Sequence, residues 1–476
     1  MDSTGTRRQK GTIEAEFEGA ELGDERLDRR LVYIAQLVGA NPGASFPTST
    51  GNDANLEATY RFLNNERVTP AEILAPHVRQ TMRRATQVEL VVVAHDTTEF
   101  NFGRFEREDL GYVGRGKSFG FYGHFSLAID FATQEPLGVI GVRTHERSGT
   151  KGRRGHKALQ TTGDNESRRW LEGAIDADAL LRPRNAPIHV MDREGDSYAL
   201  MAELVQQGLR FVIRMAGQNR KTQEDGKTVG EALLGLVVLA EREVSITTRR
   251  LSLLPAYRKN FPERNARLAH LRITATQVTL LRPASSSRSP AKTLTLNVVH
   301  VYEPEPPVGE PAVEWRLWTT EPVDTPDQVF AVIDAYRCRW LIEEYNKSLK
   351  TGCAFEKRQL ETKAGLLNAL AVLAPIAWRL LLLRTLVRDD ASTPATHVLT
   401  PVQLKCLAFA LRQLQRPPLP RAPTVRDAML GVAGLGGHIK NNGDPGWIVL
   451  GRGFEKLLTV EIGYIAATGD ERCDQS

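Results

Sequence analysis

Cysteine is scarce in this sequence: 476 residues contain four, namely Cys338, Cys353, Cys406 and Cys473. They form no CxxC pair and have no histidine at metal-ligand spacing. This pattern argues against both a zinc site and a disulfide framework. We expect four reduced thiols.

Long apolar runs are missing as well. No uninterrupted run reaches the roughly 18 residues of a membrane span, and the opening MDSTGTRRQKGTIEAEFEG contains no apolar signal region. The most apolar stretch, GLLNALAVLAPIAWRLLLLRTLVR, is interrupted by Pro375, Trp378, Arg379 and Arg384. We therefore expect a buried core helix, or a pair of helices, in a soluble cytoplasmic protein with no membrane partner.

Charge of one sign is in slight excess. Lys and Arg number 62 against 57 Asp and Glu, a net charge of +5 with a pI near 9.0. This weakly favours a polyanionic partner. The length predicts a large core and more than one domain.

The order of predicted elements indicates an open α/β sheet. A buried strand, VELVVVAHDTTEF (88–100), ends at Asp96, and a hairpin with its turn at 133–136 follows. A helix and the segment APIHVMDREGDSYALMAELVQQGLRFVIRMAG come next, predicting a strand that ends at Asp192, a helix and another strand. Ligands of open α/β sheets bind at the carboxyl ends of strands.

The segment IDAYRCRWLIEEYNKSLKTG (333–352) predicts one amphipathic helix, with Thr325 as N-cap and Pro326 as the first residue of the helix. At about 100° per residue, one face carries Cys338, Leu341, Ile342, Tyr345 and Leu349. The polar residues fall on the other face: Tyr336, Arg339, Glu343, Lys347 and Lys350. For any single helix, a solvated charged face is the simpler interpretation.

Acidic partners elsewhere change that interpretation. Asp96, Asp192 and Glu343 would repel one another at one site unless cations neutralised them. Mg²⁺ suits such oxygen ligands and bridges to substrate phosphates. Two such ions activate the attacking oxygen and stabilise the leaving one in phosphodiester chemistry. The basic stripe would then hold the phosphates on either side of the scissile one.

Three motifs together carry a resemblance to a known family. HDTT, DREGD and Y-x2-R-x3-E-x6-K resemble the three catalytic blocks of bacterial DDE transposases with a Tyr-Arg-Glu-Lys signature. The chain is more closely similar to the Tn-five type of cut-and-paste insertion-sequence transposase. The likeness extends through LGDERLDRRL, ATYRFLNN, RFVIR, WTTEPV and LGGHIK, and so covers most of the chain.

The resemblance implies a ribonuclease-H-like α/β catalytic core interrupted by a β-rich insertion, with helical N- and C-terminal domains. The corresponding ranges are 1–70 for binding of transposon-end DNA, 71–216 for the first part of the core, 217–325 for the insertion, 326–385 for the last core helices and 386–476 for dimerisation. It also implies two Mg²⁺ ions per active site, replaceable by Mn²⁺. The partners would be double-stranded DNA, both inverted repeats and target, and a second copy of the chain. The protein would be associated with the bacterial nucleoid.

The resemblance further implies a reaction through a hairpin intermediate and a role for each matching residue. Asp96, Asp192 and Glu343 would be catalytic metal ligands. The DNA-contacting residues would be Arg30, Arg61, Arg214, Tyr336, Arg339, Lys347 and Lys350. Trp315 would stack on a flipped base and Trp340 would enter the gap, which suits a tight hairpin because a base must first leave the stack.

Several alternatives stay open. Glu194 and Asp196 share the DREGD motif with Asp192, so the ligand assignment could shift within it. The arginines of 249–267 are more often a solvated surface than a DNA track. The chain could also be a DNA-binding relative that has lost catalysis, or a ribonuclease-H-like nuclease that only hydrolyses.

Overall fold

The computed structural model falls into two compact units. The central unit comprises Val88–Asp96 and Gly163–Trp340, and the terminal unit comprises Met1–Gln87, Thr97–Thr162 and Leu341–Ser476. The structure describes residues 13–104, 107–114, 118–147, 168–183, 186–224, 226–250, 262–286, 291–389, 394–439 and 445–468. Part of the basic 249–267 segment lies outside these residues.

The central unit is built on a mixed sheet with the strand order β1-β5-β6-β10-β9-β8-β7. β1, β5 and β6 run parallel, and the remaining neighbours pair antiparallel. The bounds are β1 Val91–Asn101, β5 Ile188–Met191, β6 Arg210–Arg214, β7 Ala240–Ile246, β8 Arg267–Leu281, β9 Thr293–Tyr302 and β10 Glu314–Thr319. The predicted strands of the first α/β segment and the alternating strands of 217–325 are thus present.

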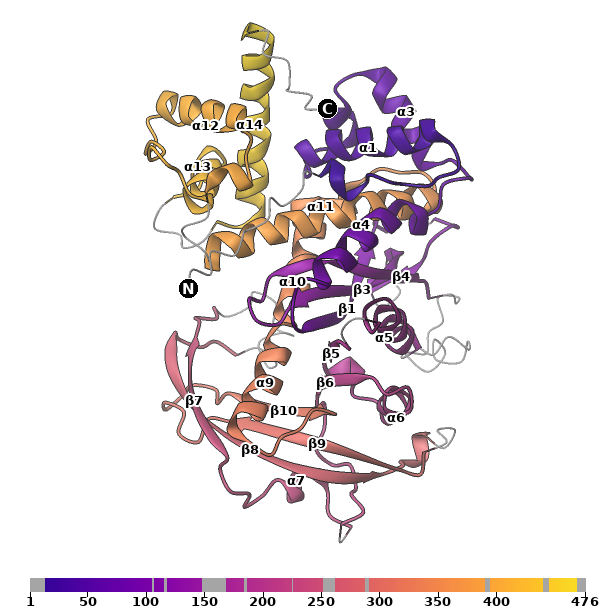
Figure 1. The fold of residues 1–476 in the computed structure, drawn as a ribbon, viewed down its shortest axis with the longest axis vertical. Coiled ribbons are helices and arrows are strands. Elements are labelled where there is room, and N and C mark those ends of the chain that lie inside the picture. The colour runs from indigo at the N-terminus through magenta and orange to yellow at the C-terminus, as the bar shows by residue number, and fades with distance from the viewer. Residues whose placement is uncertain are drawn as a thin grey trace. The chain divides into compact units, whose positions relative to one another are not determined.

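Helices cover both faces of β5 and β6 (Figure 1). α5 (Arg168–Leu181) and α6 (Tyr198–Gln206) share a buried cluster on one face with Trp318 of β10. α9 (Pro326–Arg337) contacts β5 and β6. Thr325 is its N-cap and Pro326 its first residue, as predicted, and Thr325 forms a capping box with Gln328. The short α7 (Val229–Ala232) precedes β7. Because apolar residues of β5 and β6 are buried on both faces, these strands read as continuous apolar runs.

Strand β1 corrects one expectation, because it does not end at Asp96 but continues to Asn101. The residues after Asp96 run beside β3 (Ser118–Asp130), the neighbour of β1 in the strand order. A Cβ at Gly120 would lie 1.9 Å from the Phe100 carbonyl oxygen, so the two backbones approach very closely there. Asp96 therefore lies inside β1 rather than at its end, which local sequence cannot reveal.

The terminal unit combines N-terminal helices with a small antiparallel sheet. β2 (Gly111–Val113), β3 and β4 (Pro136–His145) form this sheet, and β3 and β4 make the predicted hairpin. α4 packs on β4, and α11 packs on both. The helices are η1 Glu14–Glu16, α1 Glu25–Ala40, α2 Phe46–Thr50, α3 Asp53–Leu63, α4 Pro70–Ala85, α10 Trp340–Lys347, α11 Lys363–Asp389, α12 Pro401–Gln413, α13 Val425–Leu435 and α14 Trp447–Thr468.

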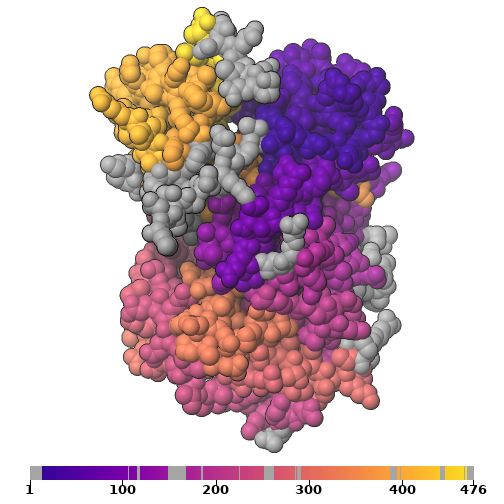
Figure 2. Space-filling view, in the orientation of Figure 1, coloured from indigo at the N-terminus to yellow at the C-terminus, as the bar shows by residue number. Residues whose placement is uncertain are grey.

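The apolar stretch after residue 363 is one helix of 27 residues, α11, which accommodates Pro375 in its interior. By length and composition α11 would be able to cross a membrane, but 83% of its most apolar window is buried inside the protein. It therefore serves as a core helix. α12, α13 and α14 pack around a cluster of their own, and their side chains form a compact block, orange to yellow in Figure 2.

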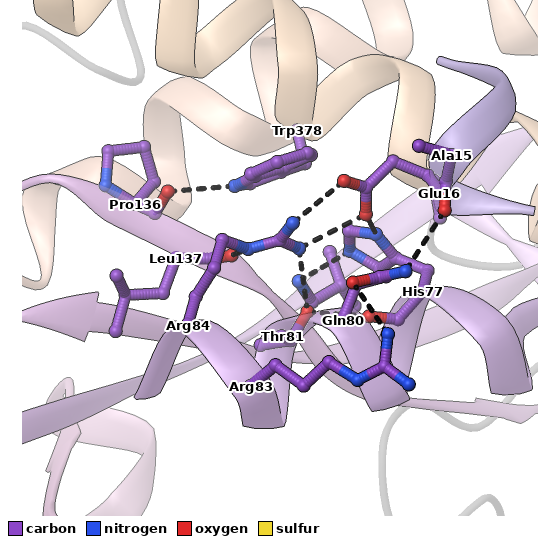
Figure 3. Close-up of polar contacts among 12 residues, drawn as sticks. Ala15, Glu16, His77, Gln80, Thr81, Arg83, Arg84, Pro136, Leu137 and Trp378 are labelled. Atoms are coloured by element: carbon purple, nitrogen blue, oxygen red, sulfur yellow. Dashed lines mark hydrogen bonds and ion pairs between the residues drawn. The ribbon is translucent and has the colours of Figure 1, made fainter. Parts of the chain in front are cut away.

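A buried polar cluster ties η1 to α4 and β4 (Figure 3). Glu16 accepts hydrogen bonds from His77 Nδ1 at 2.5 Å and from Arg84 at 2.7 Å. His77 Nε2 accepts the Val139 backbone N–H at 3.0 Å, so the proton of the neutral ring sits on Nδ1. Arg84 also lies over the Trp378 ring, 4.3 Å from its centroid. Four elements distant in sequence are thus held at one point.

The helix predicted over 333–352 is interrupted. α9 ends at Arg337 and α10 begins at Trp340, while Ser348–Gly352 forms a π-helical turn. A wheel with a constant step of about 100° therefore does not apply across the whole segment. The five residues predicted for the apolar face are nevertheless all buried: Cys338, Leu341, Ile342, Tyr345 and Leu349.

Candidate active site and nucleic-acid interface

Asp96, Asp192 and Arg214 occupy one row across the central sheet. Ala94 of β1 pairs with Val190 of β5, so continuing this register by two residues places Asp96 beside Asp192. Met191 of β5 pairs with Ile213 of β6, so continuing by one residue places Asp192 beside Arg214. Neighbouring parallel strands lie about 4.8 Å apart, and residues in register point to the same face. The two predicted aspartates are therefore adjacent, with a predicted DNA-contacting arginine next to them.

On the opposite face of the same strands lie two buried histidines, His95 and His189. His95 Nε2 lies 2.9 Å from His189 Nδ1, and His189 Nε2 lies 3.6 Å from Asp178 of α5. Burial lowers the pKa of His189, although Asp178 opposes this. His95 is thus a structural residue that faces the helical layer, away from Asp96.

The DREGD motif separates into three roles. Asp192 caps the 3-10 turn Arg193–Gly195 through the Glu194 N–H at 2.8 Å. Glu194 is 63% exposed and pairs with Arg169. Asp196, whose side chain is 1% exposed, pairs with Arg220 at 2.7 Å and accepts the Trp318 Nε1–H at 3.0 Å. The Asp196 side chain thus pairs with residues inside the fold, whereas Asp192 lies in the row with Asp96.

The face that carries the row also carries aromatic and basic side chains. Arg214 pairs with Leu317 of β10, so Trp315, two residues before Leu317, lies on the same face. The Trp315 ring is 6.3 Å from the Tyr336 ring of α9, and the Arg339 guanidinium lies 5.9 Å from the Tyr336 centroid. Three of the predicted DNA-contacting residues, Arg214, Tyr336 and Arg339, and the predicted stacking residue Trp315 therefore lie in the central unit beside the aspartates.

Tyr336 has an unusual hydroxyl. The side chain is 6% exposed, and its buried hydroxyl has no hydrogen-bond partner among the described residues. A buried unsatisfied hydroxyl costs about 1–3 kcal/mol, which a bound acceptor would offset.

Glu343, Lys347 and Lys350 belong to the terminal unit, as parts of α10 and the π-helical turn. Glu343 is partly buried and Lys347 exposed. Lys347 Nζ lies 2.7 Å from Glu344, and Lys350 Nζ lies 3.8 Å from Glu356. Glu343 is therefore not part of the row formed within the central unit.

The remaining predicted contacts lie at the surface. Arg30 of α1 stands over the Tyr33 ring at 5.6 Å, and Arg61 of α3 is 73% exposed beside Glu57. Trp340, predicted to enter the gap left by a flipped base, is 48% exposed.

The row offers two carboxylates to a metal ion. Among the described residues, no three His, Cys, Asp or Glu side chains gather closely enough to hold a metal. Asp96 and Asp192 are nevertheless neighbours on one face, and carboxylate oxygens are the ligands that hard divalent cations prefer. The residues of the row fit a divalent cation as two of its ligands.

The carboxylates of Asp96, inside β1, and Asp192, directly after β5, thus have arginine and aromatic side chains near them. A family model described as transposase DNA-binding matches residues 9–68, and one described as transposase DDE domain matches residues 89–378. The chain belongs to the DDE transposase family. A DDE domain implies a ribonuclease-H-like fold, and such domains generally use divalent metals.

One solved structure is similar to this chain, the piggyBac transposase synaptic complex with hairpin DNA. The identity is 12%, and the match covers 79% of this chain and 73% of that chain with a TM-score of 0.34. At this score we base no argument on the likeness.

The sequence interpretation missed several side chains that shape the site. Glu344, placed off the polar stripe, is buried and pairs with both Lys347 and Arg384. The partners Asp196–Trp318 and His95–His189 are about a hundred residues apart. Of the side chains that this interpretation missed, only Asp196 was indicated by the sequence, because it lies in the DREGD motif. Pairing between residues so far apart in the chain produces no pattern in the neighbouring sequence.

Proposed function

We propose that this protein is a cut-and-paste DNA transposase that cleaves transposon ends through a hairpin intermediate and joins them to target DNA. The row of Asp96, Asp192 and Arg214, with Trp315, Tyr336 and Arg339 on the same face, is the observation that carries this proposal. The transposase DNA-binding match over residues 9–68 supports recognition of transposon ends.

Asp96, Asp192 and Glu343 are the proposed ligands of two Mg²⁺ ions, which Mn²⁺ can replace. When bound, such ions activate the attacking oxygen and stabilise the leaving one. Arg214, Arg339 and the Tyr336 hydroxyl then bind phosphates next to the scissile one and fix its orientation. The basic residues also lower the cost of bringing DNA against the two carboxylates.

The aromatic residues have a separate proposed role. A tight hairpin forms only after a base leaves the stack, which costs a few kcal/mol. The Trp315 ring, held beside Tyr336, offers a stacking surface for that base, and Trp340 at the surface would enter the gap. Arg30 and Arg61 are proposed to contact transposon-end DNA, and Lys347 and Lys350 to hold phosphates.

We propose a homodimer on paired DNA ends as the active form, with residues 386–476 as the dimerisation domain and the bacterial nucleoid as its location. Residues 1–70 would recognise the ends, and 217–325 would be an insertion within the core.

The test uses DNA that carries the short inverted repeats flanking the coding region. Purified protein with Mg²⁺ should bind the repeats, release the element with hairpin ends, open each hairpin with water to free the 3′-hydroxyl, and join these ends to a plasmid. Binding without cleavage would instead indicate a relative that has lost catalysis. Cleavage that is independent of the repeats and yields no insertion would indicate a nuclease.

A further inference from the structure

Glu344 is buried on α10, yet it contacts two cations. One carboxylate oxygen lies 2.7 Å from Lys347 Nζ and the other lies 2.7 Å from an Arg384 nitrogen of α11. All three residues belong to the terminal unit. The carboxylate thus binds an ammonium group in the way that a DNA phosphate would.

The two cations are not held equally. Lys347 has a side chain 51% exposed, whereas the Arg384 side chain is 34% exposed and its guanidinium lies 4.9 Å from the Trp447 ring centroid. Lys347 is thus the partner that can leave, and Arg384 remains to neutralise Glu344. Leaving a buried carboxylate with no partner costs several kcal/mol, so a second partner makes the exchange feasible.

A second pair has the same form. Lys350 Nζ lies 3.8 Å from Glu356 Oε1, and that oxygen also accepts the Asn101 backbone N–H at 2.8 Å. Glu356, like Glu344, has another partner that stays in place when the lysine moves. Both lysines proposed to hold phosphates are therefore paired with a carboxylate that is anchored elsewhere.

We propose that Glu344, and in a weaker form Glu356, is a positioning residue that pairs with a phosphate-binding lysine in the DNA-free protein. When DNA binds, the lysine leaves this carboxylate and pairs with a DNA phosphate. The proposal rests on the proposed role of Lys347 and Lys350 in binding DNA. DNA binding then replaces the carboxylate–lysine ion pair by a phosphate–lysine ion pair. Because the first pair must break, the net gain is smaller and the affinity for DNA is lower. The carboxylates also keep the lysines oriented before DNA arrives.

The test is a double-mutant cycle on DNA affinity. Wild type, Glu344→Gln, Lys347→Gln and the double variant are titrated with a short duplex of random sequence at low salt, and the dissociation constant is measured. Because Lys347 is 51% exposed, its ion pair with Glu344 should contribute at most about 1 kcal/mol, so Glu344→Gln should tighten binding about two- to fivefold. In the Lys347→Gln background the same change should have no effect.

Glu241→Gln is the matched control. Glu241 on β7 pairs with Arg272 at 3.0 Å and is 66% exposed, so the change removes the same charge from an ion pair that has no proposed role. Tightening by this control equal to that of Glu344→Gln would overturn the proposal, as would tightening by Glu344→Gln that persists without Lys347. Absence of any tightening by Glu344→Gln would overturn it too.

Failure of the exchange is distinguishable from failure of the proposed function. If wild-type protein binds no DNA, the proposed function fails. If it binds and cleaves DNA but Lys347→Gln leaves affinity unchanged, only the exchange is wrong. Should Glu344→Gln not fold, as judged by thermal melting, the cycle of Glu356→Gln with Lys350→Gln tests the exchange by the same criteria.

Discussion

Asp96 of β1 lies level with Asp192, the first residue after the parallel strand β5, although the two are 96 residues apart in the chain. The pairs Val92↔Ile188, Val93↔His189 and Ala94↔Val190 share one constant offset, and the two aspartates continue it. Each carboxylate therefore faces the same side of the sheet. Two carboxylates so placed repel each other, and a divalent cation removes that repulsion.

Asp192→Asn should abolish Mg²⁺-dependent cleavage, by at least about 100-fold, because even the residues that support metal ligands contribute about 10- to 100-fold. DNA binding and thermal stability should change little. Cleavage of end-labelled DNA and the melting temperature are the measurements, and retained cleavage would remove Asp192 from the set of metal ligands.

Asp196→Asn should behave in the opposite way. Its carboxylate is buried against Arg220 and the Trp318 indole, so the variant leaves a partly buried guanidinium without its counter-charge. Because Arg220 is 24% exposed, we expect a loss of about 1–3 kcal/mol in the free energy of unfolding. Urea unfolding measures it. A stable variant that is inactive in cleavage would shift the ligand assignment from Asp192 to Asp196.

Glu343→Ala should likewise abolish cleavage in Mg²⁺ while binding to the inverted repeats is nearly unchanged. Glu344→Ala is not a suitable control, because Glu344 pairs with Lys347 and Arg384. Glu361→Ala, on the loop before α11, is the better comparison. Full cleavage by the Glu343 variant would exclude a ligand role.

Trp315→Ala should leave the first nick intact and reduce hairpin yield about tenfold, because stacking on an aromatic ring contributes about 1–3 kcal/mol per base. Trp315→Phe keeps a ring beside Tyr336 and should retain most of the yield. Denaturing gels of end-labelled DNA separate nicked from hairpin products. Equal hairpin yields from Trp315→Ala and wild type would contradict the stacking role.

DNA binding should weaken steeply as salt rises, because each neutralised phosphate releases counterions. Replacing Lys347 or Lys350 with Gln should reduce the slope of log K against log salt by about 0.9. Fluorescence anisotropy over a salt series measures the slope, with Lys405→Gln of α12 as the control. A slope of zero for wild type would argue against a DNA partner.

Acid should destabilise the terminal unit through Glu16. Burial alone would raise the pKa of Glu16, but hydrogen bonds from His77 and Arg84 outweigh it and lower the pKa from 4.5 to about 2. The unfolded chain therefore takes up a proton first as pH falls. The stabilisation is complete above pH 4.5 and is lost as pH approaches 2, a change of about 3 kcal/mol.

Glu16→Gln should lower the free energy of unfolding at pH 7 by about 3 kcal/mol and flatten its dependence on pH below 4.5. Glu18→Gln, two residues further on and exposed, should do neither. Urea unfolding at several pH values is the measurement. An unchanged acid profile in Glu16→Gln would show that the buried cluster does not control acid stability.

The sequence by itself determined the order of the core elements and the family of the chain, and it named the residues proposed to carry chemistry. Period and capping signals are local, so the hairpin, the strand before Asp192, the strand from Arg210 and the start of α9 at Pro326 follow from neighbouring residues. The ordered motifs HDTT, DREGD and Y-x2-R-x3-E-x6-K predicted a DDE transposase, and the family matches confirm that.

Tertiary structure decided which of these residues meet. The register of β1, β5 and β6 sets the row of Asp96, Asp192 and Arg214, and register depends on pairing between strands that lie far apart in the chain. The interruption of the helix at Cys338 and Arg339, and the second partner of Glu344 on α11, depend on packing in the same way. Local sequence carries no record of such contacts, because their free energy arises between segments that meet only in the folded chain.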